Sequence, residues 1–153
     1  MELGHDRFID LDHEFVGRDA LAEKMDDPER QKVTFVWDGD DVTDVFASLF
    51  SEGETHKFPK FPDLFQQWDL GHFDRVEKDG EVVGLSMYSC YDVNHRSVLS
   101  LGVIDTDHAE PGTDVTLVWG EEDSPKRTVE SHVEKEITAT VADAPYVTDR
   151  EDL

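Results

Sequence analysis

The sequence predicts a mainly β fold with short helices (α+β), in which antiparallel strands close into a barrel. One reason is that the apolar-rich runs Ser97–Ile104 and Asp114–Trp119 flank a linker ending in Glu110-Pro111-Gly112-Thr113. A Pro-Gly step reverses the chain sharply, so we expect these two runs to pair antiparallel. The second reason is that residues 129–141 alternate apolar and polar side chains. A straight strand of this length would extend about 44 Å, which is too far for so small a domain, so we expect it to coil around a barrel.

The N-terminal part is expected to hold a short strand, a short helix and a longer strand. Phe8–Leu11 is a short β-like run, and residues 20–24 suit a helix. The charged segment Met25–Arg30 contains a proline and should end that helix. Lys32–Trp37 alternates larger apolar residues with smaller ones, which predicts a strand.

The clearest helix begins near residue 40. Asp40 or Asp41 can cap it, and Asp44 suits the positive N-terminal end of a helix. Its apolar side chains recur at helical spacing and form one stripe that must pack on a sheet or another helix: Val42, Val45, Phe46, Leu49 and Phe50. Residues 51–73 are long for a loop and rich in aromatic side chains, so we expect them to pack across the barrel surface.

An Asp-Gly step predicts a hairpin in the middle of the chain. Arg75–Lys78 and Glu81–Ser89 flank Asp79-Gly80, which suits a two-residue type I′ turn. In the second of these strands, we expect two opposite faces, the first with Val83, Leu85 and Met87 and the second with Ser86 and Tyr88. In the last long strand Lys135 interrupts the apolar face, where we expect it to mark a bulge or the barrel rim.

The charge of the chain is extreme. Asp and Glu number 37 against 14 Lys and Arg, which gives a formal net charge of −23. Such a surface repels phosphate backbones and anionic lipids, which argues against nucleic-acid and membrane partners. The acidic residues are spread along the chain, a pattern typical of proteins from salt-accumulating halophiles, where counterions screen the repulsion.

The cysteine content and the N-terminus favour a reducing compartment. The single cysteine, Cys90, excludes an internal disulfide. The sequence shows neither a secretory leader nor an apolar run of membrane-spanning length. We therefore expect a cytoplasmic protein.

No motif predicts a catalytic or metal site. Asp38-Gly39-Asp40-Asp41 resembles the start of an EF-hand loop but lacks the glycine required at the sixth position, so a helix cap is the better interpretation. The seven histidines show no HExxH or paired Cys/His spacing, and His5 and His13 are better explained as solvated surface residues. Ser89-Cys90 is not set in a nucleophile elbow, and the cysteine is better explained as a small buried apolar residue.

Several stretches nevertheless resemble one enzyme family. Residues 15–21 (FVGRDAL) look like the F-[IV]-G-R-x-A-L segment of the glycine-cleavage T-protein (aminomethyltransferase) family, and residues 108–115 look like the A-x-P-G-T-x-[VL] hairpin of its C-terminal barrel. Residues 37–42, and residues 128–133 leading to Ala144-Pro145-Tyr146, more narrowly resemble the tetrahydrofolate-dependent aryl-methyl-ether demethylase branch, which includes the vanillate and syringate O-demethylases. The segments follow one another in the family's order over nearly the whole chain.

The resemblance implies a particular place for this chain in a larger fold. Residues 32–153 would form the six-stranded antiparallel C-terminal β-barrel of the T-protein type, and residues 1–31 would be a segment from the end of the preceding family domain. Family members have three domains with folate in a central opening that the barrel closes. The family's catalytic aspartate and its pterin-binding acidic residue lie upstream of F-x-G-R, so the resemblance implies no catalytic residue here.

Five residues are implied as cofactor contacts. Arg7 stands near the family's basic position before the motif, although the spacing differs. Tyr88, Tyr91 and Arg96 lie where the family's barrel faces the cofactor, with packing in the barrel as the competing interpretation. The aromatic residue that follows the family's Pro-[FY]-Val segment is missing from this sequence. Tyr146 is the nearest aromatic residue, and a hydrophobic closing contact is the better interpretation of its role.

The leading hypothesis is therefore the C-terminal barrel of a tetrahydrofolate-dependent methyl or aminomethyl transferase, not catalytic on its own. Its partner would be a separately encoded folate-binding T-protein-like domain, the rest of a longer enzyme, or a homodimer mate. The alternative is a non-catalytic binding or scaffolding barrel derived from that family. A weaker option is direct binding of folate by the barrel itself.

Overall fold

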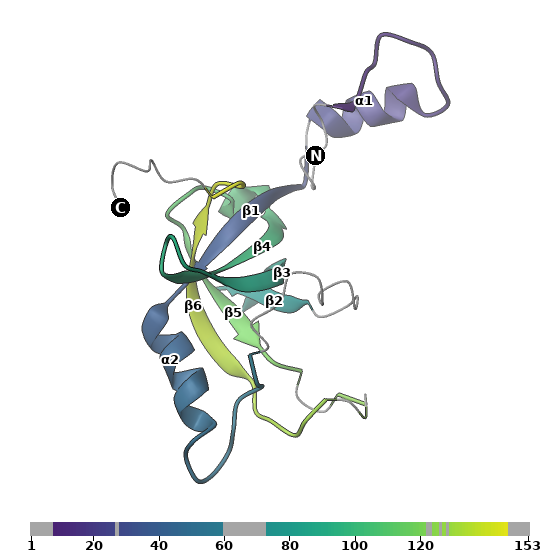
Figure 1. Cartoon of the computed structure of the whole chain (residues 1–153). Coiled ribbons are helices and arrows are strands. Elements are labelled where there is room, and N and C mark those ends of the chain that lie inside the picture. Colours follow the sequence, from purple (N-terminus) through teal and green to yellow (C-terminus); the bar gives the residue numbers. More distant parts are fainter. Residues whose placement is uncertain are drawn as a thin grey trace.

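Six strands close into one antiparallel barrel with the order β1-β4-β3-β2-β5-β6 (Figure 1). The structure is a computed structural model that describes residues 8–26, 28–59, 73–121, 124–125, 127 and 129–146. The strands are β1 (Arg30–Trp37), β2 (Asp74–Lys78), β3 (Glu81–Asp92), β4 (Ser97–Asp105), β5 (Asp114–Trp119) and β6 (Lys135–Ala142). The helices are α1 (Arg18–Asp26), α2 (Gly39–Ser48) and the short 3₁₀ helix η3 (Thr106–His108). The predicted fold, a mainly β chain with a six-stranded antiparallel barrel, is confirmed.

The core fills the inside of the barrel. Apolar side chains from all six strands point inward, and the most deeply buried are Phe35, Ile104, Leu117, Ile137, Val33, Val76 and Val141. Trp37 donates its indole N–H to Ser100 Oγ at 2.9 Å, and Ser86 Oγ lies 2.8 Å from the same oxygen. These polar atoms are therefore satisfied inside the core.

The β2–β3 hairpin has the predicted turn. Asp79 and Gly80 have φ values of 53° and 84°, as a type I′ turn requires. The predicted faces of β3 are wrong, because the β2–β3 register shifts between Val76 and Glu77. Val83 and Ser86 are both buried, whereas Leu85 and Met87 are only half-buried.

The predicted pairing of the runs on either side of Pro111-Gly112 is wrong. β4 pairs with β1 and β3, and β5 pairs with β2 and β6. The sharp turn exists, since Thr113 N–H donates to Glu110 O. However, Gly112 N–H donates to Val141 O and Val141 N–H donates to Thr113 O, so the linker is held on β6. The chain therefore crosses from one side of the barrel to the other instead of folding back on β4.

The final strand is shorter than predicted. β6 starts at Lys135, and before it only Val133 makes an isolated bridge, with His56. Ile137, Ala139 and Val141 point into the core as predicted. Lys135 lies at the barrel rim, where its Nζ pairs with Asp41 and Asp44 of α2.

The N-terminal segment and α2 correct three further details. Phe8–Leu11 forms no strand, and α1 lies apart from the barrel beyond the start of β1 (Figure 1). Asp38, not Asp40 or Asp41, caps α2 by accepting the N–H groups of those two residues. α2 ends at Ser48, so Phe50 leaves the predicted apolar stripe and is exposed.

Candidate functional site

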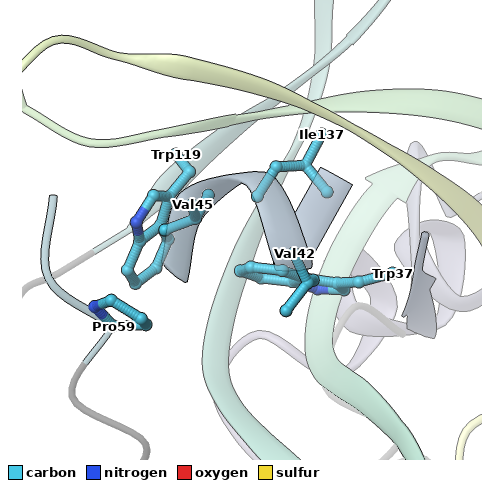
Figure 2. A pocket seen from close by; sticks show the side chains of 6 residues that line it. All are labelled: Trp37, Val42, Val45, Pro59, Trp119 and Ile137. Atoms are coloured by element: carbon cyan, nitrogen blue, oxygen red, sulfur yellow. The ribbon is translucent and has the colours of Figure 1, made fainter. Parts of the chain in front are cut away.

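The end of the barrel next to α2 is closed by packing. The Trp37 and Trp119 rings meet edge to face with centroids 5.5 Å apart. Figure 2 shows Val42 of α2 next to Trp37, and Val45 and Pro59 toward Trp119. The space left between these side chains is about 10 Å³, roughly the room that one water needs. Ligand-contacting residues must therefore lie elsewhere, on the outer surface or the opposite rim.

Two of the predicted contact residues lie together on β3. Tyr88 sits in a bulge, where the β3–β4 register shifts between Met87 and Cys90. Its φ is 55°, which is unusual for a bulky residue and marks a backbone held by its surroundings. Tyr88 and Tyr91 are each about half exposed, so both rings offer an accessible flat face.

The turn that follows β3 places Arg96 beside them. Asp92 Oδ1 accepts the N–H groups of Asn94 and His95 at 2.7 and 3.4 Å. The Asn94 N–H bond, followed by contacts with His95, keeps the pKa of the Asp92 carboxyl below its usual value. Arg96 has a φ of 53° and an exposed side chain. The turn therefore holds a cation at the same rim as the two tyrosines.

Tyr146 reaches this turn from the C-terminal end of the described chain. Its ring packs edge to face on His95, with centroids 4.8 Å apart. His95 Nδ1 lies 3.3 Å from Asp92 Oδ2. The structure thus brings Tyr88, Tyr91, Arg96 and Tyr146 to one hairpin, and we call this surface the β3–β4 rim.

Sequence reasoning missed His95 and Asp92, which build the rim. The available signal was the short polar run Asp92-Val93-Asn94-His95, whose first residue suits an Asx turn. Arg7 lies outside the described residues, so its predicted role stays a prediction. No part of the described chain gathers three or more metal-ligating side chains.

Cys90 has the environment of an inert thiol. It is half-buried beneath the rim, and burial, with a further contribution from Asp92, raises its pKa. A raised pKa keeps the sulfur protonated and poorly nucleophilic at neutral pH. The geometry gives no support to nucleophilic chemistry at this position.

A concave surface lies beside residues 53–55 and the segment before β6. It is an open groove of about 680 Å³ that is lined by Gly53, Glu54, Thr55, Glu121, Ser124 and residues 129–133. Its three glutamates, Glu54, Glu121 and Glu130, make it a poor site for a ligand that carries carboxylates. The β3–β4 rim, with its tyrosines and arginine, suits such a ligand better, but only as one wall of a site.

No family model matches the chain. A syringate O-demethylase of Sphingobium sp. (strain NBRC 103272 / SYK-6) is 37% identical over 147 residues, covering 95% of this chain and 31% of that protein. A sesamin methylene transferase of Sinomonas sp. (strain No.22) is 34% identical over 153 aligned residues, covering 95% of this chain and 32% of that protein.

These relatives confirm the resemblance stated from the motifs. The chain is homologous to part of an O-demethylase and part of a methylene transferase, and its closed six-stranded barrel is consistent with a T-protein-like C-terminal barrel. It spans about a third of the length of the curated relatives that it matches. No helix in the described ranges is long and apolar enough to cross a bilayer.

Proposed function

We propose that this chain is the barrel unit of a tetrahydrofolate-dependent one-carbon transferase. It is homologous to one third of an O-demethylase and to one third of a methylene transferase. The names of both relatives denote the removal or transfer of a one-carbon group, which supports a transfer reaction of that class. The observation that carries the proposal is the coverage: 95% of this chain matches only 31–32% of each relative. The catalytic groups would lie in the part of the enzyme that the chain does not cover.

The exposed apolar side chains support a role as part of a larger assembly. Phe8 and Val16 are 72% and 104% exposed on the segment that holds α1, apart from the barrel. Tyr88, Tyr91 and Val93 are also exposed, within six residues of one another on the β3–β4 rim. Exposed apolar side chains of this size are a feature of surfaces that another protein covers, which favours the assembly over a stand-alone binding module.

The β3–β4 rim is the surface on which this chain would meet the cofactor. Tetrahydrofolate, when bound, supplies the one-carbon acceptor. The rings of Tyr88 and Tyr91 offer flat faces for stacking of a pterin or aminobenzoyl ring, and Arg96 offers a cation for a glutamyl carboxylate. Tyr146 would act indirectly, because its ring already packs on His95 and supports the turn that carries Arg96.

The test is an assay of the full chain with tetrahydrofolate and syringate at molar KCl, alone and with the polypeptide encoded next to it. We expect no methyl transfer by the chain alone and transfer when both are present. Val16→Asp should weaken their assembly at least tenfold because it places a charge in the covered surface. Val82→Asp is the matched control. Val82 is also exposed, but it lies at the start of β3, at the end of that strand away from the β3–β4 rim. Turnover by the isolated chain would overturn the proposal, and a failure of both assembly and turnover would favour the binding-module alternative.

A further inference from the structure

Residues 53–59 form a strap across the closed end of the barrel. Trp119 donates its indole N–H to Lys57 O at 2.9 Å, and the Lys57 ammonium lies 5.8 Å from the centre of the same ring. Pro59 is buried where the strap reaches the two tryptophans (Figure 2). The strap therefore covers apolar surface that would otherwise face water.

The strap is held from outside by the segment before β6. Val133 N–H donates to Thr55 O at 2.9 Å, and His56 Nδ1 donates to Val133 O at 3.2 Å. Phe58 N–H donates to a Glu130 carboxylate oxygen at 3.0 Å. Residues 130–133 therefore supply three of the hydrogen bonds that hold the strap, besides its direct contacts with Trp119, Glu121 and Ser48.

His132 fixes this segment through both ring nitrogens. Nδ1 lies 2.8 Å from Glu130 O, and Nε2 lies 2.8 Å from the Glu121 N–H group. A carbonyl can only accept and an amide N–H can only donate, so the ring is neutral with its proton on Nδ1. The ring is buried, and a Cβ on Gly120 would lie 3.0 Å from Nε2, so the ring has little room to move away.

We propose that His132 is a proton-sensitive lock of the strap. A proton on Nε2 would face the Glu121 N–H group, so that hydrogen bond must break. Residues 130–133 then lose this attachment to residue 121, and the strap keeps its direct contacts with Trp119, Glu121 and Ser48. Acid should therefore open the strap while the barrel strands remain paired.

The charged groups around the ring already have partners of their own. Glu121 pairs with Lys57 at 2.7 Å, and Glu134 pairs with Arg75 at 2.7 Å. Glu130 accepts Phe58 N–H, and Glu54 lines the adjoining groove. The acceptor of the Glu121 N–H group is His132 Nε2, and not one of these carboxylates.

His56 is the natural control because its ring has the opposite requirement. Its observed bond uses Nδ1 as a donor to Val133 O, and that bond survives protonation of the other nitrogen. Of the two histidines that hold the strap, only His132 needs an unprotonated nitrogen. The pair therefore separates the proposed lock from a general effect of acid.

Hydrogen exchange of the full chain at molar KCl, read by mass spectrometry at pH 7.5 and 5, tests the proposal. After correction for intrinsic exchange, we expect opening of residues 53–59 to rise by about tenfold or more in acid relative to the β4 amides, as expected for one buried donor left unpaired. His132→Gln keeps an oxygen acceptor without a titrating group and should abolish this rise, whereas His56→Gln should retain it. A wild-type strap that does not respond to acid, or a response that persists in His132→Gln, would overturn the proposal.

A second measurement serves if His132→Gln does not fold. In the wild-type chain, ¹⁵N spectra of the imidazole should show Nδ1 protonated and Nε2 bare at pH 7.5. Strap exchange should then rise over the same pH range in which Nε2 gains its proton. A ring already protonated at both nitrogens at pH 7.5 in the closed strap would contradict the lock.

Discussion

At the scale of single residues, the barrel wall leaves no space at Gly102 of β4. A Cβ built there would lie 2.3 Å from both Leu85 O and Phe35 Cε2. Phe35 is fully buried, so its ring cannot turn outward without opening the core. The glycine therefore lets Phe35, the largest of the fully buried side chains, pack directly on the backbone of β4.

We expect Gly102→Ala to lower the free energy of unfolding by about 3 kcal/mol, the upper part of the range for overpacked cores. Urea unfolding at molar KCl measures this. Gly39→Ala is the matched control, because a Cβ there meets nothing within 4 Å and the residue begins α2. It should change stability by about 0.5 kcal/mol or less. A loss below about 1 kcal/mol at Gly102 would show that Phe35 can repack.

The residues of the candidate site were predictable in type but not in arrangement. Motif resemblance pointed to Tyr88, Tyr91 and Arg96, and the structure brings them to one rim. Motif resemblance could not reveal the bulge that gives Tyr88 a positive φ, since no local residue pattern there demands a bulge. Nor could it reveal that Tyr146 packs on His95, because that contact joins residues far apart in the sequence.

At the scale of elements, the local sequence predicted where most strands lie but not which strands pair with each other. Asp79-Gly80 specifies its own hairpin because both residues of a type I′ turn need positive φ. Pro111-Gly112 specifies only that the chain reverses direction. The partner of each strand depends on how the barrel closes. In the closed barrel, β6 lies beside β5, in the position that we expected for β4. Hydrophobic alternation also predicted too long a final strand. Residues 129–133 alternate, but Glu130 and Val133 bind the strap and not a neighbouring strand.

α2 is attached to β6 by a small charged cluster. Asp41 accepts the Thr138 N–H at 2.9 Å, and Lys135 Nζ lies 3.3 Å from Asp41 and 3.2 Å from Asp44. Burial alone would raise the pKa of Asp41, but the Thr138 N–H and Lys135 together outweigh it and lower the pKa below 3.8. The carboxylate form is thus the one that fastens the helix to the barrel.

This cluster predicts a pH-dependent effect of Asp41→Asn. Because the folded-state pKa is below the unfolded value of 3.8, the contribution of Asp41 is complete above that value and is lost as the pH falls through the folded pKa. At pH 7 we expect a loss of about 1 kcal/mol for this partly exposed charged hydrogen bond. Near pH 3 the difference from wild type should shrink.

Urea unfolding of both proteins across this pH range measures the difference. Asp44→Asn is the control, because Asp44 is 67% exposed and its pairing with Lys135 is screened by water, so its effect should be a few tenths of a kcal/mol. If the difference in the free energy of unfolding between wild type and Asp41→Asn stays constant with pH, the loss of stability comes from the changed shape of the side chain and not from the lost charge.

At the scale of the whole molecule, the net charge opposes the compact state. The chain carries 37 acidic residues and 14 Lys and Arg, a formal net charge of −23. The described ion pairs use several of those cations in contacts such as Arg75–Glu134 and Lys57–Glu121. Because Lys and Arg number 14 and Asp and Glu number 37, most carboxylates have no Lys or Arg to compensate their charge. Screening shortens the range of that repulsion from about 10 Å at 0.1 M salt to about 3 Å at 1 M.

We therefore expect the melting temperature to rise by about 10 °C between about 0.1 and 3 M KCl, which corresponds to a few kcal/mol for a chain of this size. Sucrose at matched osmolality separates screening from solute exclusion, since it stabilises folded proteins without screening charge. The combined variant Glu52→Gln, Asp107→Asn and Asp143→Asn removes carboxylates from exposed positions. With less repulsion to screen, its melting temperature should be higher than wild type at low salt and should depend less on KCl. A melting temperature that does not change with KCl, or a variant with the same salt slope as wild type, would show that the acidic surface does not limit stability.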